Sequence, residues 1–87
     1  MPPALQVWSH TFCKEFDRLP QNLRNTIQSK IDEIGTRLGD YPHFRLTGRD
    51  EFRLRAGDYR VIYDFDIQEN RIDLLYLGHR RQIYKRS

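Results

Sequence analysis

The feature that most constrains the fold is the recurrence of apolar residues at every second position in two neighbouring segments, residues 52–55 and residues 59–65, with strict alternation of apolar and polar residues in the first. Residues 52–55 read Phe-Arg-Leu-Arg, and residues 59–65 again place aromatic or apolar side chains at every second position. A period of two is typical of a strand with one buried face, and Ala-Gly-Asp at residues 56–58 suits a tight turn. We therefore predict an antiparallel hairpin whose face opposite the core carries Arg53, Arg55 and Arg60.

A third strand extends this hairpin. Residues 66–71 supply a second turn, and the apolar segment of residues 72–77 follows it, so residues 52–77 read as an antiparallel meander. A short strand is also predicted near the N-terminus, at residues 4–8, with Leu5 and Val7 on one face.

Two helices are predicted between the first strand and the meander. Ser9 is a suitable N-cap for the first, which Pro20 terminates. Gly39 offers a C-terminal stop for the second. The apolar residues with helical spacing are Phe12, Phe16 and Leu19 in the first helix, and Leu23, Ile27, Ile31, Ile34 and Leu38 in the second.

These elements predict an α+β fold in the order β-α-α-β-β-β, with a short C-terminal tail. The chain of 87 residues has room for one modest core, so we expect residues 1–87 to form a single domain. One face of the meander then covers the antiparallel helical hairpin. The expected core consists of Phe12, Phe16, Ile27, Ile31, Ile34, Leu54, Val61 and Tyr63.

The positive charge is concentrated in the second half of the chain. Residues 1–44 contain five Arg or Lys and five Asp or Glu, whereas residues 45–87 contain ten and seven. Residues 78–86, at the end of the chain, carry four Arg or Lys and no carboxylate. Because twelve of the fifteen basic residues are arginine, whose planar guanidinium binds phosphate with two parallel hydrogen bonds, the pattern favours a polyanionic partner.

Other features exclude some classes of protein. A single cysteine, Cys13, rules out an intrachain disulfide and a zinc site built on paired thiolates. No apolar run approaches the roughly 20 residues that span a bilayer, so we expect a soluble cytoplasmic protein that needs no metal and no cofactor. His10 and His43 read as surface or capping residues, and Tyr59, Tyr63 and Tyr76 as core or boundary aromatics.

The arginines also have an ordinary interpretation. Each of the three on the hairpin could pair on a solvated strand face with a nearby carboxylate, those of Asp50, Asp58 and Asp64 being closest in sequence. Taken singly, such a pair is the simplest explanation for each arginine.

Two segments together resemble a known family. Residues 52–63, Phe-Arg-Leu-Arg-Ala-Gly-Asp-Tyr-Arg-Val-Ile-Tyr, and residues 78–84, Gly-His-Arg-Arg-Gln-Ile-Tyr, are similar to the RelE/ParE superfamily of type II toxins. The order of the predicted elements resembles that superfamily as well. Within it, the basic and tyrosine set favours the RelE-like branch.

The resemblance implies a toxin whose partners are a cognate antitoxin, the ribosome and mRNA, without a cofactor. A RelE-like member is a metal-independent endoribonuclease that cleaves mRNA in the ribosomal A site by 2′-OH attack. Two alternatives stay open. One is a ParE-like toxin that inhibits DNA gyrase, and the other is an inactive basic domain that binds RNA or protein.

The resemblance also implies roles for individual residues. Arg53 and Arg60 would hold the scissile phosphate, and Arg80 would lie near the leaving oxygen. Tyr84 and His79 compete for the role of proton acceptor. Glu51 and Arg53 stand where family ribonucleases can carry lysines, and arginine stabilises charge without titrating near neutral pH. General contacts with RNA fall to Arg55, Arg81, Lys85 and Arg86.

Overall fold

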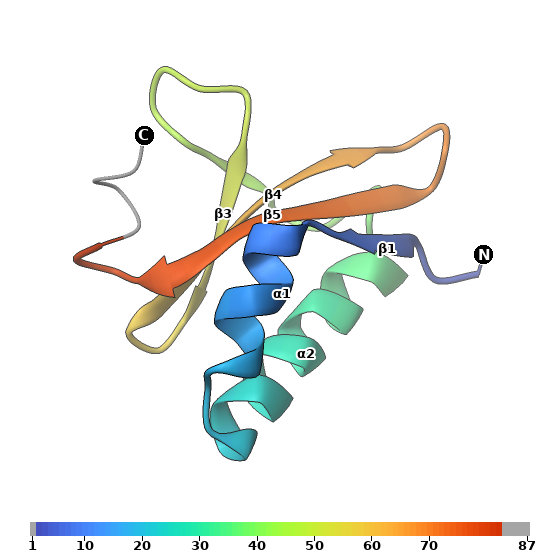
Figure 1. The fold of residues 1–87 in the computed structure, drawn as a ribbon. Coiled ribbons are helices and arrows are strands. Elements are labelled where there is room, and N and C mark those ends of the chain that lie inside the picture. The colour runs from blue at the N-terminus through green and yellow to red at the C-terminus, as the bar shows by residue number, and fades with distance from the viewer. Residues whose placement is uncertain (1, 83–87) are drawn as a thin grey trace.

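A twisted sheet with both helices on one face organises the chain (Figure 1). The structure, a computed structural model, describes residues 2–82. Its sheet has five strands in the order β1-β5-β4-β3-β2. Along the chain the elements are β1 (Leu5–Trp8), α1 (His10–Asp17), α2 (Gln21–Thr36), β2 (Phe44–Arg45), β3 (Phe52–Ala56), β4 (Tyr59–Asp66) and β5 (Arg71–His79).

The predicted α+β fold and its meander are confirmed. Strands β3, β4 and β5 pair in antiparallel order. Two pairings at the edges were not foreseen. Strand β1 joins the sheet parallel to β5, and the segment expected to be a loop before the meander contains the two-residue strand β2, which pairs with β3.

The helices begin as expected, but both end earlier: α1 ends at Asp17, before Leu19 and Pro20, and α2 ends at Thr36. The Ser9 Oγ accepts a hydrogen bond from the Phe12 N–H at 3.0 Å, which caps α1. Helix α2 ends at Thr36, because Arg37 leaves helical dihedral angles and donates its N–H to the Ile34 carbonyl. Gly39 is therefore not the stop, although Leu38 remains buried beyond the helix. Neither helix in the described residues is long and apolar enough to cross a membrane.

The core lies between the helices and the inner face of the sheet. The fully buried residues of the helices are Phe12, Ile27, Ile31 and Ile34, and those of the sheet include Val61, Tyr63, Ile72, Leu74 and Leu77. Burying a side chain of this size stabilises the fold by about 1.5–3 kcal/mol. The predicted core is confirmed, with Phe16 half-buried at its margin and Trp8 packed edge-on against Phe12 and Phe16 at 4.8 Å.

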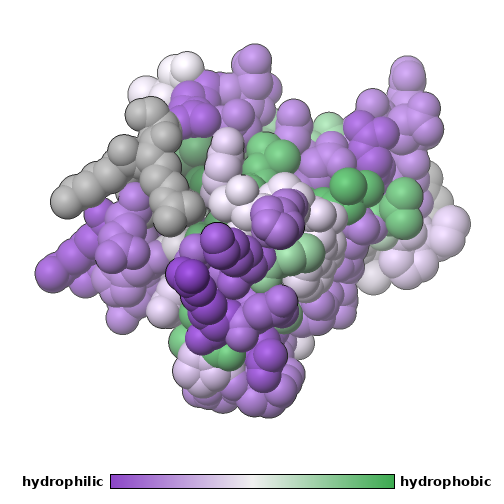
Figure 2. All heavy atoms as spheres, in the orientation of Figure 1, coloured by the Kyte–Doolittle hydropathy of each residue, from purple (hydrophilic) through white to green (hydrophobic). Residues whose placement is uncertain are grey.

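The two apolar side chains of β1, Leu5 and Val7, lie on the outer face of the sheet. Leu5 and Val7 share a face, as predicted, but the parallel register on β5 makes it the face away from the helices. They are 65% and 43% exposed. Figure 2 shows hydrophobic residues gathered over this edge of the sheet, whereas the surface over α1 is hydrophilic.

A β-bulge overturns one prediction about the aromatics. Tyr63 is buried and Tyr59 packs against the core, as expected. However, the register of β4 on β5 shifts by one residue, so that Tyr63 pairs with Leu74 while Ile62 pairs with Tyr76. The extra residue, Leu75, reverses the alternation beyond it. Tyr76 therefore lies on the outer face and is exposed, not in the core.

His43 is not the surface residue that its isolation in the sequence suggested. Its ring lies in a half-buried aromatic cluster, stacked on Phe65 at 4.0 Å. One ring nitrogen, Nε2, is 2.9 Å from the Leu38 carbonyl oxygen, and Nδ1 is 2.7 Å from the Tyr63 hydroxyl. Because a carbonyl only accepts, Nε2 donates to it, and Nδ1 of the neutral ring accepts the hydrogen bond from Tyr63. This pair joins the segment after α2 to the core.

The Tyr63 hydroxyl gives a prediction about stability. Burial raises the pKa of Tyr63 above its usual value of about 10. The folded protein thus keeps a proton that the unfolded chain releases, so stability present below about pH 10 is lost as the pH rises further. Tyr63→Phe should cost about 1 kcal/mol at neutral pH, since His43 Nδ1 loses its donor, and should show a shallower alkaline loss.

Denaturant unfolding at neutral and alkaline pH measures both effects. Tyr76→Phe, at an exposed tyrosine, is the matched control and should behave like the wild type. Equal alkaline slopes for Tyr63→Phe and the wild type would contradict the assignment.

Candidate functional site

Three arginines of the β3–β4 hairpin share the face of the sheet that the helices leave open. In the register, Arg53 lies opposite Ile62 and Arg55 opposite Arg60. Directly opposed residues of an antiparallel pair point to the same side. Since Leu54 and Val61 point into the core, the arginines point the other way, as the alternation predicted.

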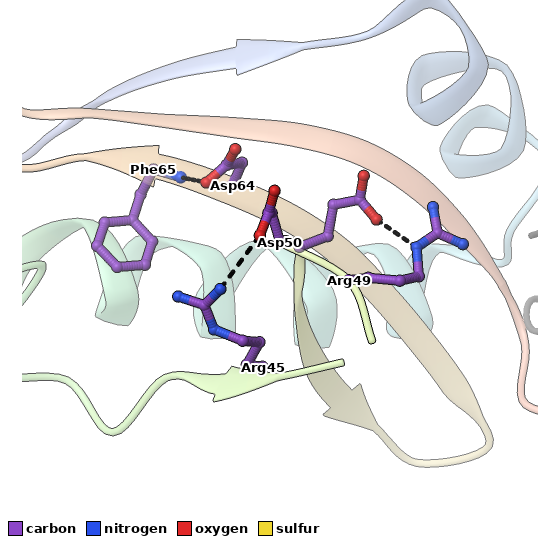
Figure 3. Close-up of polar contacts among 6 residues, drawn as sticks. Arg45, Arg49, Asp50, Asp64 and Phe65 are labelled. Atoms are coloured by element: carbon purple, nitrogen blue, oxygen red, sulfur yellow. Dashed lines mark hydrogen bonds and ion pairs between the residues drawn. The ribbon is translucent and has the colours of Figure 1, made fainter. Parts of the chain in front are cut away.

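Arg53 and Arg55 form no ion pair with any carboxylate in the described residues. The acids that the sequence offered as partners are engaged elsewhere, and Figure 3 shows this for Asp50 and Asp64. Asp50 pairs with Arg45 at 3.4 Å, and Asp64 accepts the Phe65 N–H at 2.8 Å. Asp58 pairs with Arg80 at 3.8 Å. The ordinary interpretation of Arg53 and Arg55 as partners of these three acids is therefore wrong.

Glu51 does not neutralise the arginine face either. Its carboxylate accepts a hydrogen bond from Arg49 Nε at 2.6 Å, and both side chains are half-buried. The charge of Glu51 is thus balanced within the loop that joins β2 to β3.

Arg60 lies on the same face but is only 8% exposed. Its Nη1 donates to the carbonyl oxygens of Gly57 and Tyr59, both at 2.8 Å. Gly57 has a φ of +60°, which side chains disfavour, at the tip of the hairpin. Arg60 therefore closes the turn between β3 and β4, and its guanidinium is held against the backbone of that turn.

Arg80 meets the same turn from the end of β5. Its N–H donates to the Asp58 carbonyl at 2.7 Å, in addition to the ion pair with the Asp58 carboxylate. The structure thus brings Arg60 and Arg80 together at the β3–β4 turn. Arg81 follows on an exposed turn.

His79 lies apart from the arginines. It pairs with Tyr59 across β4 and β5, and their rings meet edge-on at 5.8 Å, which places it on the helix side of the sheet. There it lines a small hollow with Glu15 of α1 and Arg18, the residue that follows this helix. Its Nδ1 accepts a hydrogen bond from the Arg81 N–H at 3.2 Å. Tyr84, Lys85 and Arg86 lie outside the described residues.

A cleft at the edge of β3 adds residues that the sequence did not single out. It has a volume of about 350 Å³, and Arg53 and Arg55 line it together with Lys30, Tyr41 and Phe44. Partial burial, with the nearby Glu33 carboxylate, raises the pKa of Tyr41, which keeps the phenol neutral. Tyr76 lies in the same cross-strand row as Arg53 and Ile62. The one feature of the sequence that could have indicated Lys30 was its position beside the apolar residues of the second helix.

The chain matches the model of a known protein family. Residues 7–84 match the family model of the ParE toxin of type II toxin-antitoxin systems. No curated protein sequence matches the chain significantly.

Solved structures show a similar fold. The free Escherichia coli toxin RelE, as an arginine-to-alanine double mutant, has a TM-score of 0.76 at 15% identity over 95% of this chain and 90% of its own. The RelE-RelB complex of Pyrococcus horikoshii has a TM-score of 0.75 at 23% identity, over 93% of this chain and 99% of its own. The RelBE2 toxin-antitoxin complex of Mycobacterium tuberculosis has a TM-score of 0.72 at 20% identity, over 91% of this chain and 93% of its own.

The two kinds of arginine on this face should respond differently to truncation. Arg60→Ala leaves the Gly57 and Tyr59 carbonyls without their donor, so we expect the free energy of unfolding to fall by about 1–3 kcal/mol. Arg55→Ala, at an exposed side chain without an ion pair in the described residues, should stay within about 0.5 kcal/mol of the wild type. Urea titrations measure both. Equal losses would mean that Arg60 does not hold the turn.

Proposed function

Since the chain belongs to the RelE/ParE superfamily of type II toxins, we propose that it is a ribosome-dependent endoribonuclease that cleaves mRNA in the ribosomal A site and so inhibits translation. The observation that carries the proposal is the unneutralised pair Arg53 and Arg55 on the open face of the hairpin. Cations without carboxylate partners are suited to bind and stabilise phosphate.

The proposed reaction needs no metal. The 2′-OH oxygen gives up its proton and attacks the adjacent phosphorus, the bond to the 5′-oxygen breaks, and the 5′-oxygen takes a proton. A 2′,3′-cyclic phosphate and a 5′-OH end result. Negative charge builds on the phosphoryl oxygens in the transition state, where fixed cationic donors are most effective.

We assign the residues as follows. Arg53 contacts the scissile phosphate and Arg55 a flanking one. Arg80 stabilises the leaving oxygen, since its ion pair with Asp58 is solvent-exposed, is worth less than about 1 kcal/mol and can yield to a phosphate. Arg60 positions the turn through its two carbonyl contacts. Arg81, Lys85 and Arg86 give general attraction to RNA.

Proton transfer is assigned to Tyr84. His79 faces the helix side, and its Nδ1 already accepts a hydrogen bond, which disfavours it as the proton acceptor. A phenol, with an ordinary pKa of about 10, acts as a base only where cations stabilise its anion, and the arginine face offers such cations.

A cognate antitoxin is the proposed protein partner. The solved counterparts include RelE-RelB complexes from Pyrococcus horikoshii and Methanococcus jannaschii. An acidic segment of an antitoxin would complement the arginine face.

Mutation of the arginine face tests the endonuclease. In a translation reaction with purified ribosomes, we expect Arg53→Ala to reduce mRNA cleavage by about a hundredfold or more, because it removes a donor to the scissile phosphate. Arg18→Ala, which removes an exposed arginine just after α1, is the control. Primer extension on the mRNA measures the cut sites. Undiminished cleavage by Arg53→Ala would refute the site.

Inhibition of DNA gyrase is the second candidate, favoured by the match to the ParE toxin model. A gyrase supercoiling assay with the purified protein distinguishes the two. The endonuclease proposal expects mRNA cleavage without loss of supercoiling. Loss of supercoiling at protein levels that leave mRNA intact would reverse the assignment.

A further inference from the structure

The cleft beside β3 exists because β2 is short. Strand β2 pairs only with Phe52 and Arg53, so the edge of residues 54–56 has no neighbouring strand in the described part of the chain. Helix α2 passes beside this edge on the core side and contributes Lys30. The cleft therefore runs from the outer arginine face around the edge of the sheet to the helix.

Three cations line the cleft, and none is neutralised among the described residues. Lys30, Arg53 and Arg55 come from two elements distant in sequence, and none has a carboxylate within 4.0 Å. The lining itself contains no Asp or Glu. Lys30 is half-buried, so its stem packs while its ammonium group keeps access to the cleft. Such a concentration of one charge needs an anion to balance it.

Two aromatic rings accompany the cations. Phe44 is 61% exposed although it is apolar, and it lies directly opposite Arg53. Tyr41 also lines the cleft, with its ring 5.4 Å from that of His43. An exposed aromatic ring beside guanidinium groups is the arrangement with which proteins stack unpaired bases. An acidic peptide would need the cations but not the rings.

We propose that this cleft binds one nucleotide of single-stranded RNA next to the scissile phosphate, with Lys30 on the backbone phosphate and Phe44 against the base. The inference rests on the proposed function, because Arg53 and Arg55 serve both sites. It adds a contact from α2, on the far side of the sheet edge, and a volume within the range of about 300–1,000 Å³ that ligand sites have.

Binding of a fluorescein-labelled oligouridylate, measured by anisotropy over a series of KCl concentrations, tests the proposal. Lys30→Gln should weaken binding about tenfold and reduce the slope of log affinity on log salt by about 0.7, the value for one phosphate contact on a single strand. Phe44→Ala should also weaken binding about tenfold, by loss of stacking, but leave the slope unchanged.

Matched controls separate the cleft from general effects. Lys14→Gln removes an exposed lysine of α1, and Leu5→Ala removes an exposed apolar side chain of β1; both should bind like the wild type. Thermal melts of all four variants check folding. Affinities of Lys30→Gln and Phe44→Ala equal to those of their controls would overturn the proposal.

The same variants in the translation reaction distinguish this inference from the proposed function. If RNA binding depends on Lys30 and Phe44 but the wild type never cleaves mRNA, the cleft stands and the endonuclease fails. If the wild type cleaves mRNA and both cleft variants bind and cleave like the controls, the endonuclease stands and the cleft fails. A labelled polyglutamate peptide tests the other kind of ligand. If binding of this peptide requires Lys30 and Phe44 but binding of RNA does not, the cleft is assigned to an acidic protein segment and the proposal is wrong.

Discussion

The antiparallel register of β3 on β4 determines both faces of the sheet. Leu54 opposite Val61 contributes to the core, and the next pair, Arg55 opposite Arg60, stands on the open face. A slip of one residue would bury the arginines and expose the core. The same hydrophobic burial that stabilises the fold therefore fixes where the cations point, and no separate device is needed to present them.

The distribution of ion pairs then decides which cations are available. Several arginines outside the hairpin pair with the carboxylates near them, including Arg45 with Asp50, Arg49 with Glu51 and Arg80 with Asp58. These pairs are local and mostly exposed, so each adds little stability. Their larger effect is to occupy the acids around the arginine face. Arg53, Arg55 and Lys30 have no carboxylate partner within the described part of the chain.

A half-buried polar contact links the core to the cleft. His43 is held between the Tyr63 hydroxyl and the Leu38 carbonyl, which fixes the segment that leads from α2 into β2. Phe44 is the next residue and lies opposite Arg53. The packing of His43 against Phe52, Tyr63 and Phe65 thus positions the exposed ring of Phe44 beside the cations. Because β2 then ends after Arg45, the rest of the β3 edge stays open.

The amino-acid sequence by itself determined the two helices, the meander and the shared face of Arg53, Arg55 and Arg60, because periods of 3.6 and 2 residues are local properties of the chain. Only the tertiary structure decided the rest. The bulge at Leu75 placed Tyr76 on the outer face, and the parallel pairing of β1 exposed Leu5 and Val7. In the hairpin turn, Arg60 donates hydrogen bonds to backbone carbonyls. Likewise, β-strand pairing put His79 on the helix side, and the short β2 let Lys30 reach the cleft. Apart from the contacts of Arg60, which are local to the turn, each of these outcomes depends on which other segment lies alongside. Alternation within a single segment carries no information about its neighbour.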